Sequence, residues 1–195
     1  MPAAGNGDTL AVFVSGDGGW AGLDKNVASS LNEHGVAVVG IDSLRYFWSE
    51  RTPKGFAGDL QKIIDHYRQQ WHRDKVMLIG FSQGADVLPA TINQLDADTR
   101  AALDRIVLLS VGRKADFEFH VSNWLGGGGD GLPIAPEVAR LPAEKTLCVY
   151  GDKDEDALCP DLPANDGVRK VKLPGDHHFG GDYDRLAEVI LKGGM

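Results

Sequence analysis

The chain contains a serine whose surroundings can make its hydroxyl a nucleophile. Ser82 is the centre of a Gly-x-Ser-x-Gly motif, residues 80–84, which follows the apolar run 76–79 and precedes a helical pattern that reaches about Leu95. A strand, a sharp turn and a helix in this order form the nucleophile elbow of serine hydrolases. The turn leaves little room beside the serine, so it needs glycines. We predict that Ser82 attacks an acyl carbon; the alternative is an ordinary turn with a capping serine.

A serine hydroxyl is a poor nucleophile at neutral pH and needs a general base, most often an imidazole. Two neighbouring histidines, His177 and His178, follow the last predicted strand. We assign the base to His177, because one residue separates it from Phe179 and His-x-Phe resembles the base loop of many α/β-hydrolases. His178 is the alternative base, and otherwise it braces the loop or lines the site.

The imidazole in turn needs a carboxylate to hold its tautomer and stabilise its charged form. We choose Asp154, which stands three residues after Gly151 at the end of the fifth predicted strand. Asp152 and Asp156 lie in the same loop and remain alternatives. The resulting order of serine, acid and histidine along the chain is the one found in α/β-hydrolases.

A glycine-rich segment, residues 15–20, follows the first predicted strand. In serine hydrolases of this architecture, such a loop and the residue after the nucleophile supply the N–H groups that bind the oxyanion. We expect these donors to be Gln83 and either Gly16 or Asp17. Asp17 and Trp20 are unusual in a glycine turn unless they contact something, so we expect both to bind substrate. The alternative is a plain glycine turn.

The elements that must position these residues alternate along the chain. Apolar runs predict strands at 10–14, 36–41, 76–79, 106–111 and 146–150, and a sixth strand is predicted at 169–173. Helices are predicted at 24–34, 56–71, 85–95, 97–103 and 182–191. Continuous apolar strands separated by helices are typical of a buried parallel sheet. We therefore predict an α/β fold with a doubly wound, mainly parallel six-stranded sheet and helices on both faces. The candidate residues then meet at the carboxyl ends of the strands.

The length of 195 residues favours one domain, which we place at 9–195. Residues 1–8 are small and polar, and we expect them to be disordered or to remain from a removed leader or preceding domain. Residues 112–140 interrupt the pattern with aromatic residues, prolines and a run of four glycines. We predict a flap or substrate loop over the site; the alternative is a disordered surface loop.

Composition excludes several classes of function. The net charge of −8, from 20 basic and 28 acidic residues, argues against nucleic-acid binding. No apolar run approaches the ~20 residues of a membrane span. No metal-ligand cluster and no phosphate-binding loop is evident, so we expect neither a metal nor a cofactor. The spacing of the two cysteines, Cys148 and Cys159, leaves open whether they form a disulfide.

Three motifs together resemble the bacterial VirJ/AcvB virulence-protein family. They are Ser-Gly-Asp-Gly-Gly-Trp at 15–20, Gly-Phe-Ser-Gln-Gly-Ala-Asp-Val-Leu-Pro at 80–89 and Pro-Gly-Asp-His-His-Phe at 174–179. The resemblance extends from about Thr9 to Leu191. It implies an α/β-hydrolase fold and a periplasmic location. AcvB-type members hydrolyse lysyl-phosphatidylglycerol and carry an extra N-terminal domain, whereas VirJ-type members are linked to type IV secretion. We therefore expect a short VirJ-type protein or an excised C-terminal domain.

The resemblance implies a partner and a reaction. The expected substrate is an aminoacylated phospholipid at the membrane surface, whose cationic lysyl group an acidic protein would attract. Asp17 or Asp86 would pair with the lysyl ammonium, although Asp86 could equally stabilise the first turn of its helix. An oxidising periplasm favours a Cys148–Cys159 disulfide. We expect a monomer. The alternatives are a generic carboxylesterase or thioesterase, and a binding module for secretion or envelope proteins.

Overall fold

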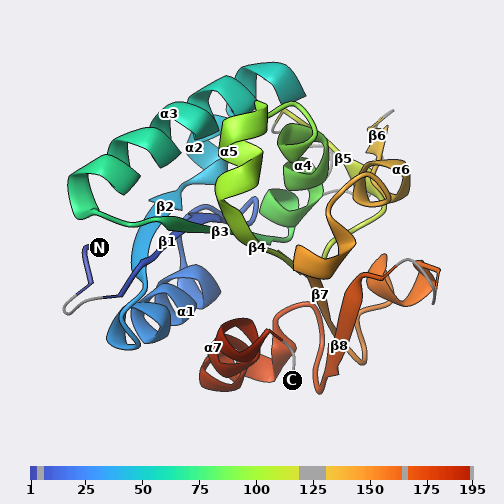
Figure 1. Ribbon diagram of the computed structural model, residues 1–195. Helices are drawn as coiled ribbons and strands as arrows, with labels where there is room; N and C mark the ends of the chain where they lie inside the picture. The colour runs from blue at the N-terminus through green and yellow to red at the C-terminus, as the bar shows by residue number, and fades with distance from the viewer. Residues whose placement is uncertain (4–6, 119–130, 164–166, 194–195) are drawn as a thin grey trace.

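The computed structural model describes residues 1–3, 7–118, 131–163 and 167–193. Its centre is a six-stranded parallel sheet with the strand order β2-β1-β3-β4-β7-β8 (Figure 1). The strands are β1 (Thr9–Val14), β2 (Ala37–Ile41), β3 (Lys75–Phe81), β4 (Leu103–Leu109), β7 (Thr146–Gly151) and β8 (Arg169–Leu173). All six overlap the predicted strands, and the predicted fold class is confirmed.

Helices cover both faces of the sheet. They are α1 (Gly22–Glu33), α2 (Ser43–Tyr46), α3 (Pro53–Trp71), α4 (Gln83–Ile92), α5 (Ala97–Ala102), α6 (Ala135–Val138) and α7 (Tyr183–Lys192). Short 3₁₀ helices lie at Ala143–Lys145, Cys159–Asp161 and Phe179–Gly181. Figure 1 shows α1 and α7 together on one face of the sheet and α3 and α4 on the other. The sheet is therefore doubly wound, as predicted.

Side chains of β1 show why the sheet is buried on both faces. Leu10, Val12 and Val14 point into the core beneath α3 and α4, while Ala11 and Phe13 point into the core beneath α1 and α7. All five are fully buried. Alternate residues of a strand face opposite sides, so a strand between two helical layers must be apolar throughout.

Helix boundaries differ from the predicted ones where local hydrogen bonds decide them. The helix α3 begins at Pro53 instead of residue 56, because the Thr52 hydroxyl accepts a hydrogen bond from the N–H of Gly55 and proline suits a first helical position. The short helix α2 lies in a segment predicted to be a loop, and the Asp42 carboxylate caps it. The helix α4 ends at Ile92 instead of Leu95.

The predicted flap at 112–140 is described only in part. Its ends form a small antiparallel pair, β5 (Lys114–Ala115) with β6 (Leu132–Pro133), and α6 follows. Residues 119–130, which include the glycine run, lie outside the described residues. At the N-terminus, the backbone of Met1 forms hydrogen bonds in both directions with Val38 of β2.

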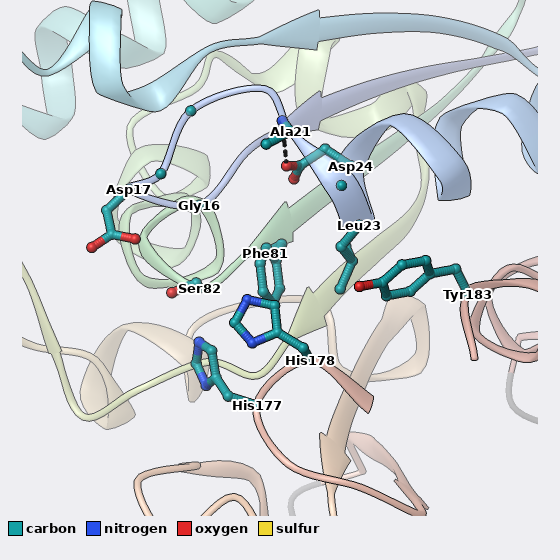
Figure 2. Close-up of a pocket in the computed structure, with 13 residues that line it drawn as sticks. Gly16, Asp17, Ala21, Leu23, Asp24, Phe81, Ser82, His177, His178 and Tyr183 are labelled. Carbon is teal, nitrogen blue, oxygen red and sulfur yellow. Dashed lines mark hydrogen bonds between the residues drawn. The ribbon is translucent and has the colours of Figure 1, made fainter. Parts of the chain in front are cut away.

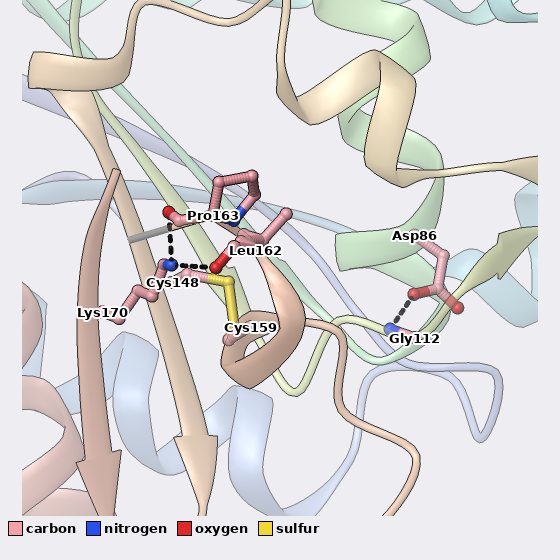
Figure 3. Close-up of a disulfide and its surroundings, with 7 residues drawn as sticks. All are labelled: Asp86, Gly112, Cys148, Cys159, Leu162, Pro163 and Lys170. Atoms are coloured by element: carbon pink, nitrogen blue, oxygen red, sulfur yellow. Dashed lines mark hydrogen bonds between the residues drawn. A yellow bond between two sulfur atoms is a disulfide. The ribbon is translucent and has the colours of Figure 1, made fainter. Parts of the chain in front are cut away.

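The two cysteines form a disulfide in the structure (Figure 3). Cys148 lies in β7 and Cys159 in a 3₁₀ helix, and both are fully buried. The disulfide links β7 to the segment that follows the loop at the carboxyl end of β7. The Lys170 ammonium of β8 donates hydrogen bonds to the carbonyls of Leu162 and Pro163 in the same segment. Within the described ranges, no helix is both long and apolar enough to cross a membrane.

Candidate active site

Ser82 occupies the turn between β3 and α4 with a strained backbone. Its φ is 52° and its ψ is −122°, a conformation that non-glycine residues rarely adopt. Its N–H donates a hydrogen bond to the carbonyl of Leu109 in β4 at 3.0 Å. Strain of this kind persists only where the surrounding structure enforces it, and it is concentrated at functional sites. The conformation is that of a nucleophile elbow.

The two glycines of the motif are required by close backbone contacts. A Cβ atom on Gly80 would lie 2.5 Å from the backbone of Gly84 and Ala85. A Cβ atom on Gly84 would lie 2.1 Å from the carbonyl oxygen of Val14. The start of α4 therefore packs directly on the carboxyl end of β1, next to the glycine loop 15–20.

We expect Gly84→Ala to lower the free energy of unfolding by about 3 kcal/mol or more. The obstructing atoms belong to the backbone of Val14 and Ser15, so the added methyl group would force the backbone of β1 or of α4 to move. Urea unfolding of the parent and the variant measures this difference. Gly58→Ala is the control, because a Cβ atom there meets nothing within 4 Å. Equal stability of Gly84→Ala and the parent would contradict the packing described.

A pocket of about 560 Å³ lies over the elbow (Figure 2). Its walls come from the glycine loop, the start of α1, the end of β3, the loop after β8 and the start of α7. They comprise Gly16, Asp17, Gly18, Gly19, Ala21, Gly22, Leu23, Asp24, Phe81, Ser82, His177, His178 and Tyr183. The fold thus brings the candidate nucleophile, both candidate bases and the glycine loop to one hollow.

His177 is paired with a buried carboxylate. Its Nδ1 lies 3.0 Å from Oδ2 of Asp154, whose side chain is only 4% exposed. The side chain of Asp152 has another partner, since it accepts a hydrogen bond from the N–H of Gly175. Asp156 is exposed. Among the three acids considered, the geometry therefore singles out Asp154.

The second histidine lies beside the first without a comparable partner. The rings of His177 and His178 are 5.6 Å apart, and both contact the ring of Phe81. In the described part of the chain, no hydrogen bond involves the His178 imidazole, and none joins the Ser82 hydroxyl to either imidazole. Such bonds are often long in free enzymes and shorten when substrate binds.

The candidate oxyanion donors surround Ser82. Gln83 is the first residue of α4, so its N–H has no partner within the helix. Gly16 lies against the elbow, because a Cβ atom there would be 3.4 Å from Cβ of Ser82. Asp17 follows and lines the same pocket.

Asp24 is a pocket residue that the sequence did not reveal. It is 3% exposed, and its carboxylate accepts a hydrogen bond from the N–H of Ala21. Burial raises the pKa of Asp24 to about 6, and the backbone N–H groups of Ala21 and Gly16 partly offset this rise. An acidic residue in the first turn of α1 was the available signal.

Two residues predicted to bind substrate do not line this pocket. The indole of Trp20 packs on Gly40 of the edge strand β2, where a Cβ atom would lie 2.6 Å from the ring, and it faces a separate hollow. The Asp86 carboxylate points to the end of β4 and accepts a hydrogen bond from the N–H of Gly112 at 2.7 Å (Figure 3). Trp20 therefore packs on β2, and Asp86 links α4 to the segment after β4, so neither side chain faces the pocket.

Asp86 makes stability depend on pH. Burial raises the pKa of Asp86 from its usual 3.8 to about 8, and the nearby carboxylates of Asp116, Asp17 and Asp154 add to the rise. The folded protein therefore keeps a proton between about pH 4 and pH 8 that the unfolded chain releases. Stability from this group is present at low pH and is lost as pH rises to 8.

We expect Asp86→Asn to be less sensitive to pH than the parent. The amide keeps an oxygen for the N–H of Gly112 but does not titrate. Between pH 5 and pH 8, the free energy of unfolding should fall by at least about 1 kcal/mol less in the variant. Urea unfolding at several pH values measures the two slopes. Identical slopes would show that Asp86 does not retain this proton.

Together, the parallel sheet, the strained elbow and the acid and histidine at the strand ends define an α/β-hydrolase fold. No group of three or more potential metal ligands occurs among the residues that the structure describes. The chain belongs to the VirJ family of bacterial virulence proteins, whose sequence profile matches residues 8–194.

Solved structures share this fold at low sequence identity. Est1E from Butyrivibrio proteoclasticus, with ferulic acid bound, has a TM-score of 0.69 and 18% identity over 99% of this chain and 91% of its own. XC6422 from Xanthomonas campestris, a serine hydrolase without a lid, has a TM-score of 0.61 and 19% identity over 99% and 84%. The thioesterase domain from the curacin biosynthetic pathway has a TM-score of 0.62 and 17% identity over 94% and 91%. No curated protein sequence matches the chain.

Proposed function

We propose that the chain is a serine esterase that hydrolyses the aminoacyl ester of lysyl-phosphatidylglycerol. The observation that carries the proposal is the pairing of buried Asp154 with His177, which lines the pocket that contains Ser82. These three groups have the roles of nucleophile, base and orienting acid in acyl transfer. Membership of the VirJ family supports the choice of substrate and a periplasmic location.

The proposed reaction proceeds through an acyl-enzyme. Asp154 accepts a hydrogen bond from the Nδ1–H of His177, which leaves Nε2 free to take the proton of Ser82. The serine oxygen attacks the ester carbonyl, and the N–H group of Gln83 together with that of Gly16 or Asp17 stabilises the oxyanion. The C–O bond to the glycerol oxygen breaks, and His177 returns the proton to that oxygen. Water then repeats the sequence and releases lysine.

The electrostatics near Ser82 suit a cationic acyl group. Asp17 lines the pocket, and its negative charge contributes to the raised pKa of Asp86. The whole chain carries a net charge of −8. A lysyl ester brings ammonium groups that such a field attracts and orients.

Lysine release from lysyl-phosphatidylglycerol in mixed vesicles tests the proposal. We expect the parent to release lysine and leave phosphatidylglycerol, with a soluble aryl ester measured in parallel. Cleavage of the aryl ester alone would support the first alternative, a carboxylesterase or thioesterase with another acyl substrate. Cleavage of neither ester by folded protein would favour a module that binds secretion or envelope proteins.

We expect Asp17→Asn to lower the preference for lysyl esters over neutral esters about 10-fold, the value of one charge-assisted hydrogen bond. The ratio of kcat/KM for a lysyl ester and an acetyl ester measures this preference. Asp86→Asn is the matched control and should keep the parent ratio. An unchanged ratio in Asp17→Asn, or a fall only in Asp86→Asn, would remove Asp17 from ammonium binding.

A further inference from the structure

Ser110 is a buried serine with a strained backbone at the carboxyl end of β4. It is 1% exposed, and its φ is 48°, in the left-handed region that favours glycine. A non-glycine residue in this conformation costs free energy, and the cost indicates that the side chain has a use. Ser110 lies outside the elbow and the loops of the proposed acid and base.

The hydrogen bonds of this strand end reach the nucleophile, the strand before the acid, and the loop of the base. The carbonyl of Leu109 accepts the N–H of Ser82 at 3.0 Å. The N–H of Ser110 donates to the carbonyl of Val149 at 2.8 Å, on the strand that leads to Asp154. The Ser110 hydroxyl donates to the backbone carbonyl of His177 at 3.0 Å. Two consecutive residues thus connect the nucleophile, the acid strand and the base.

The loop that carries His177 needs such support, because its backbone is unusual. Gly175, Phe179, Gly180 and Gly181 all have positive φ, and Phe179 is not a glycine. The loop is held at its start by contacts to the acid loop: the N–H of Gly175 donates to Asp152, and the N–H of Lys153 donates to the carbonyl of Gly175. The Ser110 hydroxyl holds the loop at the peptide unit of His177 itself.

We propose that Ser110 is a positioning residue that fixes the His177 backbone so that the imidazole meets both Asp154 and Ser82. Its left-handed conformation turns the hydroxyl from the strand end toward the base loop. The effect on hydrolysis rests on the proposed function, whereas the effect on the His177–Asp154 pair does not. A displacement of about 1 Å at a reacting group can cost ~10²-fold in rate.

Two substitutions separate the hydrogen bond from the strain. Ser110→Ala removes the hydroxyl and keeps the strained Cβ, whereas Ser110→Gly removes both. If Ser110 had only a structural role at the carboxyl end of β4, Ser110→Gly would be at least as stable as the parent and fully active. If it positions His177, both variants lose reactivity at Ser82, although Ser110→Gly relieves the strain.

The rate at which a fluorophosphonate labels Ser82 is the readout. The serine oxygen bonds to phosphorus, fluoride leaves, and the serine proton passes to His177, so the rate reports base geometry without a choice of substrate. We expect the maximal labelling rate to fall about 10- to 100-fold in both variants with little change in probe affinity. Labelling of Ser110→Gly at the parent rate would overturn the proposal.

Thr146→Val is the matched control. Thr146 is 2% exposed, and its hydroxyl also donates to a backbone carbonyl, that of Pro142, but at the opposite end of the sheet. It should lose stability comparable to that lost on removing the Ser110 bond and keep the parent labelling rate. Slow labelling in this variant as well would show that the assay responds to stability, and would overturn the assignment to Ser110.

A second measurement keeps the inference testable without any hydrolase activity. The downfield proton signal of the His177 Nδ1–H reports its hydrogen bond to Asp154. We expect this signal to shift or broaden in Ser110→Ala and Ser110→Gly but not in Thr146→Val. If the parent is not labelled at Ser82, the proposed function fails while this signal still decides the inference, and an unchanged signal in both Ser110 variants overturns it.

Discussion

Ser82→Ala is expected to lower lysine release from lysyl-phosphatidylglycerol by about 10⁴-fold or more. The variant lacks the atom that forms the acyl-enzyme, so only oxyanion binding and orientation remain. The Cβ atom and the elbow backbone are kept. The lost hydroxyl makes no hydrogen bond in the described ranges, so the unfolding temperature should stay close to that of the parent. Chromatographic measurement of free lysine over time gives both rates.

The control for this experiment is Ser49→Ala, which removes an exposed hydroxyl far along the chain from the elbow. It should release lysine at the parent rate. Full activity of Ser82→Ala would mean that another residue is the nucleophile. If Ser82→Ala loses both lysine release and its fold, as seen by circular dichroism, covalent labelling of the parent identifies the nucleophile instead. A fluorophosphonate should then label Ser82 and no other serine.

Local patterns in the sequence were sufficient to predict the sheet and the elbow. Most strands of the sheet are short apolar runs, and the motif around Ser82 carries its own steric requirement in the glycines 80 and 84. A parallel sheet then places the strand ends together, so the loop of Asp154 and the loop of His177 could be brought to the site by topology alone. These inferences need no knowledge of individual contacts.

The remaining site residues depend on contacts between distant segments. Asp86 looked like a pocket residue because it lies one helical turn after Ser82, yet its carboxylate turns to Gly112. Trp20 is the last residue of the glycine loop but packs on the edge strand. Ser110 carries no motif, and its partner is 67 residues away. Side-chain direction at a strand end is set by backbone angles that composition does not encode.

His177→Ala is expected to lower hydrolysis of lysyl-phosphatidylglycerol about 10⁴-fold, whereas His178→Ala should change it less than 10-fold. The two residues are adjacent, line the same pocket and contact the same ring, so each variant is the control for the other. Their imidazoles differ in hydrogen bonding: that of His177 is paired with Asp154, and that of His178 makes no hydrogen bond in the described part of the chain.

That hydrogen bond makes the comparison decisive. A base needs its second nitrogen fixed by an acceptor so that the first can take the serine proton, and a histidine without an acceptor is oriented only by packing. Lysine release by the two variants at pH 7 measures the difference, and added imidazole should partly restore activity to His177→Ala by entering the space left beside Ser82. A larger loss in His178→Ala would assign the proton transfer to His178 and leave the Asp154 pair with a structural role. Equal losses in both variants would contradict the assignment of the base to His177 alone.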